Sequence, residues 1–254
     1  MAEVSAQQRI TRRQRILLGV CGVALLLAIL AGGLYLLGQP QRAPTVQGIV
    51  LYPSPKVPDF QVTDHQNRPF TQAELKGRWH LVSYGFTHCP QFCASTLASV
   101  AALTRLLAEE DSAYADVGLL FYSVDAERDT PAQLARYVTH FHPDLIGLTH
   151  TGAPGERFVP FERGLGITYQ RVASHLGAHN VRSFDQSTSV SRTAVTTNTD
   201  YTVNHGVKLV LLNPDGQLQA VFEPSFHPYH GLHYFSLAQL KEDYLAVRRH
   251  FEYP

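Results

Sequence analysis

The chain has 254 residues, enough for one large domain or two small ones, and its 21 lysines and arginines balance 21 aspartates and glutamates. A chain without excess positive charge has no extended basic surface, so we expect no nucleic acid partner. The charge is uneven only at the N-terminus, where a group of arginines precedes a long uncharged stretch.

That uncharged stretch predicts a membrane-spanning helix. Residues 16–38 consist largely of Leu, Ile, Val and Ala, and their length suffices to cross a bilayer. A cleavable signal peptide usually has a shorter apolar region and a small-x-small cleavage site, which the following GQPQRAP does not provide. Cys21 does not fit a lipoprotein cysteine, because it follows bulky Val20 and lies inside the apolar run. We therefore expect a retained anchor, with Cys21 embedded in the bilayer.

The charges beside this helix predict its orientation. They are Arg9, Arg12, Arg13 and Arg15. Such a cluster keeps residues 1–15 in the cytoplasm and places the rest of the chain on the outer face. A mitochondrial transit peptide fits less well, because the segment before the anchor is short and contains Glu3. We predict one pass through a bacterial inner membrane, with the main domain in the periplasm.

A proline-rich segment follows the anchor. Residues 39–58 contain five prolines and few periodic apolar residues. In polyproline geometry, at about 3.1 Å per residue, such a segment spans up to about 50 Å. We predict a tether at 39–58 and a single folded domain at 59–254.

The first part of this domain alternates strands and helices. In chain order we expect a strand at 59–63, a short helix at 71–77, a buried strand at 80–86, a helix at 94–110, a buried strand at 117–124 and a helix at 131–141. The last of these helices starts with a capping box, Thr130-Pro131-Ala132-Gln133. The order strand, helix, strand, helix indicates an α/β fold with a parallel pair at its centre.

The second part contains a hairpin and a final helix. Strands expected at 207–212 and 218–222 flank the turn sequence Asn213-Pro214-Asp215-Gly216. A helix is expected at 236–250. Residues 173–200 are rich in Ser, Thr, Asn and Gly and predict an irregular excursion, with a hairpin as the alternative.

Cys89 and Cys93 lie where the strand at 80–86 gives way to a helix. One helical turn apart, both sulfurs project from one face, within reach of a shared metal ion or of each other. A position near the helix N-terminus favours the Cys89 thiolate. The three intervening residues exceed the two of the usual thioredoxin motif. In an oxidising periplasm the pair becomes a disulfide unless a redox partner reduces it; a purely structural disulfide would close too short a loop to add much stability.

Three motifs in order, YGFTHCPQFC at 84–93, SVDAERDTP at 123–131 and YTVNHGVKLVLLNPDG at 201–216, resemble the Sco/SenC family. The resemblance covers residues 58–250. It implies a thioredoxin-like central sheet flanked by helices, after a single N-terminal transmembrane helix. It also implies a copper protein that helps to assemble cytochrome c oxidase.

The resemblance further implies a copper site. In the family, the two cysteines of the motif and a distant histidine bind copper, and the matching positions are Cys89, Cys93 and His205. Thiolates select Cu(I), and Cu(II) is a second state for such a centre; an imidazole completes a three-coordinate site with an open side for transfer. The expected partners are the copper-bearing oxidase subunit or another copper chaperone.

The chain departs from the family pattern close to this site. The departures are Gln91 and Asn204 at positions where acidic residues are common, Gly206 after the histidine, and Ala94 and Ala126 in place of prolines. Fewer carboxylates near the metal bear on partner docking and on copper redox behaviour.

Other polar residues are candidates for supporting roles. Asp125 either orients a ligand through a hydrogen bond or stabilises a turn. Asp129 either lies close enough to the site to influence it or helps to start the following helix. His227, His230 and His233 form an auxiliary copper or zinc site if helical, but Pro228 and Gly231 favour an aromatic, histidine-rich loop. His88 adjoins Cys89 and is expected to point elsewhere.

The family resemblance and the cysteine pair allow two main functions. The first is a copper metallochaperone for the copper A centre of cytochrome c oxidase. The second is a thiol-disulfide oxidoreductase that keeps the copper-site cysteines of a partner reduced, with Cys89 as the attacking and Cys93 as the resolving thiol. A peroxidase is disfavoured, because GFTHCPQFC does not reproduce the P-x-x-x-T-x-x-C pattern of peroxiredoxins. No sequence feature rules out a copper sensor.

Overall fold

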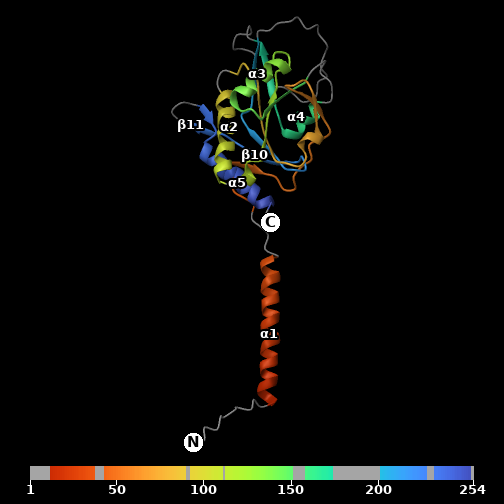
Figure 1. Cartoon of the computed structure of the whole chain (residues 1–254), viewed down its shortest axis with the longest axis vertical. Coiled ribbons are helices and arrows are strands. Elements are labelled where there is room, and N and C mark those ends of the chain that lie inside the picture. Colours follow the sequence, from red (N-terminus) through yellow and green to blue (C-terminus); the bar gives the residue numbers. More distant parts are fainter. Residues whose placement is uncertain are drawn as a thin grey trace. The chain divides into compact units, whose positions relative to one another are not determined.

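The computed structural model describes residues 12–37, 43–89, 92–110, 112–150, 158–173, 201–227 and 232–252. The chain divides into two compact units, Met1–Ala43 and Pro44–Pro254 (Figure 1). In the first unit, helix α1 (Arg12–Leu37) is long and apolar enough to cross a membrane, and its side chains from 13 to 35 are exposed. Among the residues that the structure describes, nothing covers this apolar surface, which is what a helix in contact with lipid requires.

The second unit is built on an eight-stranded mixed sheet. Its strands are β1 (Gly48–Val50), β2 (Gln61–Asp64), β3 (Pro69–Thr71), β4 (His80–Gly85), β5 (Gly118–Ser123), β6 (Leu145–Thr149), β9 (Leu209–Leu212) and β10 (Leu218–Phe222). Their order across the sheet is β1-β10-β9-β4-β5-β6-β2-β3. Strands β4, β5 and β6 run parallel, in a register that places Gly85 beside Ser123, and the other pairs are antiparallel.

Helices cover both faces of this sheet. The α-helices of the unit are α2 (Cys93–Glu110), α3 (Pro131–Phe141), α4 (Val159–Leu165) and α5 (Leu237–Glu252), and the short 3-10 helices are η1 (Gln72–Leu75) and η2 (Ser112–Tyr114). Alternate side chains of the central strands enter different cores. Leu81 packs with α2, α3 and α5, whereas Val82 packs with α4. The central strands are therefore buried on both faces, as their continuous apolar sequences predict.

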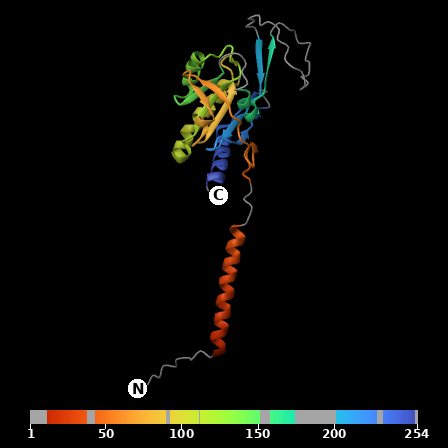
Figure 2. The same ribbon diagram turned by 90° about the vertical axis from the view of Figure 1, so that its right-hand side faces the viewer.

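Two further strand pairs lie outside the main sheet. Strand β7 (Tyr169–Ala173) pairs antiparallel with β8 (Tyr201–His205). Strand β11 (Ser225–His227) pairs antiparallel with β12 (Leu232–Tyr234). Figure 2 shows the β7–β8 ribbon as two adjacent strands that stand apart from the main sheet. Both pairs contribute residues to the site described below.

Local sequence signals explain several element ends. The Thr130 side chain accepts a hydrogen bond from the backbone of Gln133, with Pro131 at the start of α3. A complete capping box between Thr71 and Glu74 starts η1. At the turn between β9 and β10, Gly216 adopts a φ of 71°, which favours glycine. The start of α3 and the turn at Gly216 lie where they were predicted, and η1 lies within the short helix predicted at 71–77; the capping box at Thr71 was not predicted.

The structure also differs from the sequence predictions. Within the predicted tether, Gly48–Val50 forms β1 and pairs with β10, so part of that segment belongs to the folded unit. Strand β6, helix α4 and the two small strand pairs were not predicted, and β11 and β12 replace part of the expected histidine-rich loop. Most of the excursion predicted at 173–200 lies outside the described residues, but the strands that flank it pair with each other.

A buried histidine makes the stability of the domain depend on pH. His80 is 1% exposed, and burial, reinforced by repulsion from Arg78, lowers its pKa to about 4. Between about pH 6.5 and pH 4 the unfolded chain binds a proton at this residue that the folded chain does not, so stability falls as pH falls. The full loss from this residue is about 3 kcal/mol. Partly buried His150 acts in the same direction, because burial lowers its pKa to about 4.

Denaturant unfolding of the full chain in detergent, over a series of pH values, measures this loss. The variant His80→Leu is expected to lose less stability on acidification than the unmodified protein. Exposed His140 provides the matched control, and His140→Leu is expected to keep the original pH dependence. An unchanged slope in His80→Leu would contradict the assignment.

Candidate metal centre

The two cysteines lie on either side of the junction between β4 and α2. Strand β4 ends at Gly85, Cys89 follows in the connecting loop, and Cys93 is the first residue of α2. They are not joined by a disulfide in this structure. Cys93 is buried, at 4% exposure, whereas Cys89 is partly exposed. The pair therefore has one sulfur that is accessible to solvent and one that is enclosed by the protein.

Gly85 makes room for the enclosed sulfur. A Cβ atom at this position would lie 2.3 Å from Cys93 Sγ and 3.4 Å from His205 Cε1. The first separation is far below the contact distance of about 3.5–4.0 Å between nonbonded atoms. Because the backbone of β4 comes so close to the sulfur, only glycine fits here.

His205 completes the group from a different element. It is the last residue of β8, and its Nε2 lies 3.7 Å from Cys93 Sγ. Its Nδ1 lies 2.8 Å from the Gly206 carbonyl oxygen. A carbonyl only accepts, so Nδ1 donates, and Nε2 of the neutral ring presents its lone pair to the sulfurs. The rings of Phe86 and Tyr84 contact the imidazole edge-on, with centroids 5.7 Å and 6.0 Å away.

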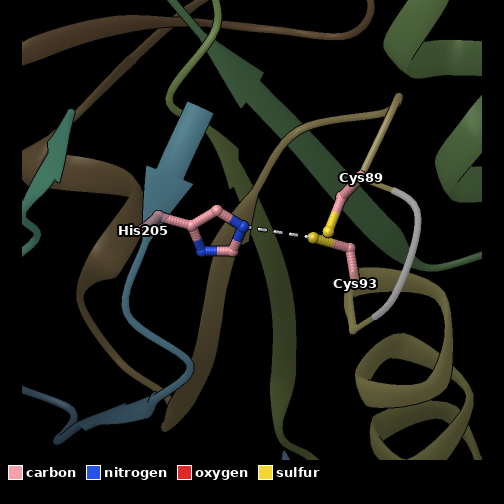
Figure 3. Close-up of side chains that lie close together, drawn as sticks. All are labelled: Cys89, Cys93 and His205. Atoms are coloured by element: carbon pink, nitrogen blue, oxygen red, sulfur yellow. Dashed lines mark hydrogen bonds between the residues drawn. The ribbon is translucent and has the colours of Figure 1, made fainter. Parts of the chain in front are cut away.

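These three side chains form a geometry that could hold a metal ion. The sulfurs of Cys89 and Cys93 and a ring nitrogen of His205 all lie within 4.8 Å of one another (Figure 3). Two atoms that bind one ion at about 2.0–2.3 Å lie at most about 4.6 Å apart. A small inward movement of the side chains therefore suffices. Two sulfurs and one imidazole are soft donors, which select Cu(I) or Zn(II) over ions such as Mg²⁺.

The two thiols influence each other's ionisation. The hydrogen bond with Cys89, together with burial, raises the pKa of the Cys93 thiol. Because metal ions bind thiolates, loading the centre has to release the thiol protons. The metal-free centre thus holds at least one neutral thiol at neutral pH.

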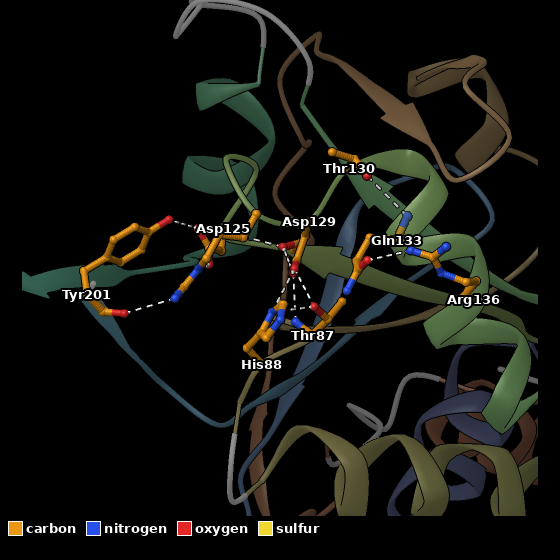
Figure 4. A network of polar contacts seen from close by, with 10 residues as sticks. Thr87, His88, Asp125, Asp129, Thr130, Gln133, Arg136 and Tyr201 are labelled. Carbon is orange, nitrogen blue, oxygen red and sulfur yellow. Dashed lines mark hydrogen bonds and ion pairs between the residues drawn. The ribbon is translucent and has the colours of Figure 1, made fainter. Parts of the chain in front are cut away.

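Asp129 anchors the loop that carries Cys89. This carboxylate is fully buried and accepts hydrogen bonds from the Thr87 backbone (2.8 Å), the Thr87 hydroxyl (2.6 Å) and the Ser123 hydroxyl (2.6 Å) (Figure 4). His88 turns toward the same group, with its Nδ1 3.8 Å from Asp129 Oδ1. Of the two roles considered for Asp129, the structure shows contact with the loop leading to Cys89, while Thr130 caps α3.

Asp125 contacts the strand that carries His205 rather than a ligand. It is fully buried and accepts hydrogen bonds from Arg128 and from the Tyr201 hydroxyl. The Arg128 guanidinium also lies 4.0 Å from the centre of the Tyr201 ring and donates to the Tyr201 carbonyl at 3.1 Å. Asp125 and Arg128 together hold the first residue of β8, and His205 is the last.

An open groove gives access to the centre. It has a volume of about 620 Å³, and its walls include Cys89, His205, Phe86, Phe92 and His233. Cys93 lines a smaller pocket behind it, together with Ser83 and Thr96. A ligand in the groove therefore meets the Cys89 sulfur and the imidazole of His205 first.

Of the three histidines considered for an auxiliary metal site, the structure describes one side chain, that of His233. His230 and the side chain of His227 lie outside the described residues. His233 is on β12 and faces the groove. Among the described side chains, the group of three donors contains only Cys89, Cys93 and His205.

Comparison with known proteins identifies the family of this chain. The sequence model of the SCO1/SenC family matches residues 51–233. The chain belongs to this family. The matched range 51–233 includes Cys89, Cys93 and His205.

Individual relatives support the family membership. The chain is 35% identical over 158 residues to the mitochondrial protein SCO2 homolog of Bos taurus, which covers 62% of this chain and 50% of the relative. It is 32% identical over 163 residues to a putative copper-binding protein of Stutzerimonas stutzeri, covering 64% and 67%. The chain spans about half the length of the SCO2 relatives that it matches.

Solved structures confirm the predicted fold class. Arabidopsis thaliana ScoI with copper bound superimposes with a TM-score of 0.54 at 26% identity, over 77% of this chain and 98% of that one. Bradyrhizobium japonicum ScoI with copper bound gives 0.53 at 25%, over 76% and 98%. The second unit is thus a Sco-type, thioredoxin-like domain, with a mixed central sheet flanked by helices.

Sequence reasoning missed three residues around this centre. Gly85 gives space to a sulfur, and Tyr201 connects Asp125 to β8. Thr87 connects Asp129 to the cysteine loop. Gly85 and Thr87 stand inside the quoted motif at 84–93, which is the one sequence signal that could have drawn attention to them.

Proposed function

We propose that this chain is a membrane-anchored copper metallochaperone that binds copper at Cys89, Cys93 and His205. The observation that carries the proposal is the convergence of these three donors beside an open groove, in a chain of the SCO1/SenC family. Two solved structures of similar ScoI proteins have copper bound, and these proteins are 26% and 25% identical to this chain. Copper is the cargo in this proposal, and the residues exchange it with partners.

The open side of the centre supports transfer rather than storage. Three protein donors leave a Cu(I) ion able to accept a further ligand from a recipient. Cys89 and His205 face the groove, so a recipient's side chains reach the ion from that side. The family resemblance supports the copper-bearing subunit of cytochrome c oxidase, and its copper A centre, as the recipient.

The proposed location is the bacterial inner membrane. Helix α1 serves as the anchor, the arginines at and before its N-terminal end stay in the cytoplasm, and the second unit works in the periplasm. A thiol reagent that does not cross membranes should then label Cys89 in cells whose inner membrane is intact. Labelling only after lysis would contradict this orientation.

Anaerobic titration of the full chain in detergent with Cu(I), in competition with a chromophoric chelator, tests the function. The unmodified protein is expected to bind one ion tightly. The variants Cys89→Ser and His205→Ala each lose one donor and are expected to bind at least about tenfold more weakly. Cys21→Ser is the matched control, because this third cysteine lies in α1, and should bind normally. Unaltered binding in both site variants would disprove the proposal.

A second function is supported by the arrangement of the thiols. Partly exposed Cys89 shares a hydrogen bond with buried Cys93, which suits an attacking and a resolving thiol. In this reaction Cys89 attacks a partner disulfide, and Cys93 then displaces the partner to form the Cys89–Cys93 disulfide, so two electrons pass to the partner. The variant Cys93→Ser should trap the mixed disulfide. Reductase activity that survives His205→Ala would favour this role over copper transfer.

A further inference from the structure

A third imidazole lies along the groove that leads to the metal centre. His233 belongs to β12, on the small β11–β12 hairpin outside the main sheet. It lines the same groove as Cys89 and His205. The groove is therefore bordered by donor side chains from three separate parts of the chain.

Two aromatic rings contact this imidazole. The ring of Phe92 lies 6.3 Å from the His233 ring, at an interplanar angle of 67°. The ring of Phe226 lies 5.4 Å away on the paired strand, at 54°. Phe92 immediately precedes Cys93, so the first of these contacts connects the hairpin directly to the cysteine motif.

The nitrogens of His233 are available to a ligand. Among the residues that the structure describes, neither ring nitrogen of His233 has a hydrogen-bond partner; its contacts are with the two phenylalanine rings. His205 differs, since its Nδ1 is committed to the Gly206 carbonyl and its Nε2 faces Cys93. This exposed ring, which lies beside apolar neighbours at the wall of an open groove, keeps both of its nitrogens available to a passing ion.

His233 is not part of the resident set of donors. The compact group within 4.8 Å contains Cys89, Cys93 and His205 only, among the described side chains. Cys93 lines the smaller pocket behind the groove. An ion that moves between solvent and the two sulfurs thus travels along a groove whose wall includes His233.

We propose that His233 is an exchange ligand, which binds copper while the ion enters or leaves the centre. This inference rests on the proposed copper-carrying function. During release, a bond from copper to His233 forms as a bond to a resident donor breaks, and during loading the order reverses. Only ligands are exchanged, so the oxidation state of copper does not change, and the thiol protons released on loading pass to solvent.

Such a ligand acts on rates more than on affinity. During exchange, His233 binds the ion while a resident donor leaves it. The ion therefore keeps at least one protein ligand throughout, which lowers the barrier to transfer. Because the empty and fully loaded states do not use His233, the equilibrium affinity of the centre is unaffected. His205 is expected to behave in the opposite way, since it belongs to the resident set.

Stopped-flow transfer of Cu(I) from the loaded full chain in detergent to a chromophoric chelator tests this role. His233→Phe keeps a ring between Phe92 and Phe226 but removes both nitrogens. It is expected to slow transfer about tenfold, which corresponds to about 1.4 kcal/mol in the barrier. The equilibrium affinity is expected to stay within about twofold of the unmodified value. His140→Phe, in an exposed part of α3, provides the control and should transfer at the normal rate.

The outcomes separate the two proposals. Normal transfer rates in His233→Phe, with copper bound normally, would overturn the role of His233 and leave the metallochaperone proposal intact. If His233→Ala slows transfer but His233→Phe does not, the ring matters only through packing, and the exchange role is again overturned. A wild-type chain that binds no copper would overturn both.

Discussion

Replacing Gly85 by alanine is expected to weaken copper binding at the proposed centre strongly. The new Cβ would lie 2.3 Å from Cys93 Sγ, so the sulfur has to move by more than about 1 Å to restore contact distance. That movement separates it from the Cys89 sulfur and from His205. We expect affinity for Cu(I) to fall by about 100-fold or more, the upper range for changes around metal ligands.

Gly147 offers a matched control for this substitution. It lies on parallel strand β6, where a Cβ would meet Leu134 Cβ and Val138 Cγ1 at 3.1 Å, away from the sulfurs. Overpacking of this kind costs about 1–3 kcal/mol of stability. Gly147→Ala should therefore lose stability but keep its affinity for copper. Equal copper affinities for Gly85→Ala and the unmodified chain would show that the geometry of the centre does not depend on Gly85.

Replacing Asp129 by alanine is expected to cause the largest loss of stability near the site. The buried carboxylate accepts two hydrogen bonds from Thr87 and one from Ser123, and alanine leaves these donors unsatisfied. Hydrogen bonds to charged groups contribute about 1.5–3 kcal/mol each, and removing one member of a buried charged network costs about 3–5 kcal/mol. We expect a loss of about this size in denaturant unfolding of the full chain in detergent.

The same substitution should also weaken metal binding. Thr87 lies two residues before Cys89, so releasing it frees the loop that positions the accessible sulfur. Asp144→Ala is the matched control, because this aspartate is exposed, and we expect little change in either property. A small stability loss in Asp129→Ala, comparable with that of the control, would refute the anchoring role.

The centre of the fold was predictable because its signals are local and strong. Continuous apolar sequences mark β4 and β5 as strands buried on both faces, and helical spacing of leucines marks α2. The edges were harder to predict. Strand β1 lies in a proline-rich stretch and exists because it pairs with β10, about 170 residues away. Pairing between distant segments leaves no periodic pattern in either of them.

In the candidate centre too, local features were predictable and contacts between distant residues were not. Cys89, Cys93 and His205 were identified from residue types, spacing and family resemblance. The supporting contacts were not, because each joins positions that only the fold brings together: Asp129 reaches Thr87 across 42 residues, and Tyr201 reaches Asp125 across 76. For Asp125, the sequence left a bond to a ligand and turn chemistry as alternatives; the described contacts of its side chain are with Arg128 and Tyr201 and not with a ligand.

Because the β7–β8 ribbon is separate from the main sheet, the three donors come from two parts of the domain that share no strand hydrogen bonds. The cysteines belong to the junction of β4 and α2, whereas His205 belongs to a pair of strands with its own hydrogen bonds, 112 residues from Cys93. Under the proposed function, a bound ion cross-links these two parts of the domain. Because β8 forms its strand hydrogen bonds with β7 alone, a change in the position of His205 breaks no hydrogen bond between strands of the main sheet.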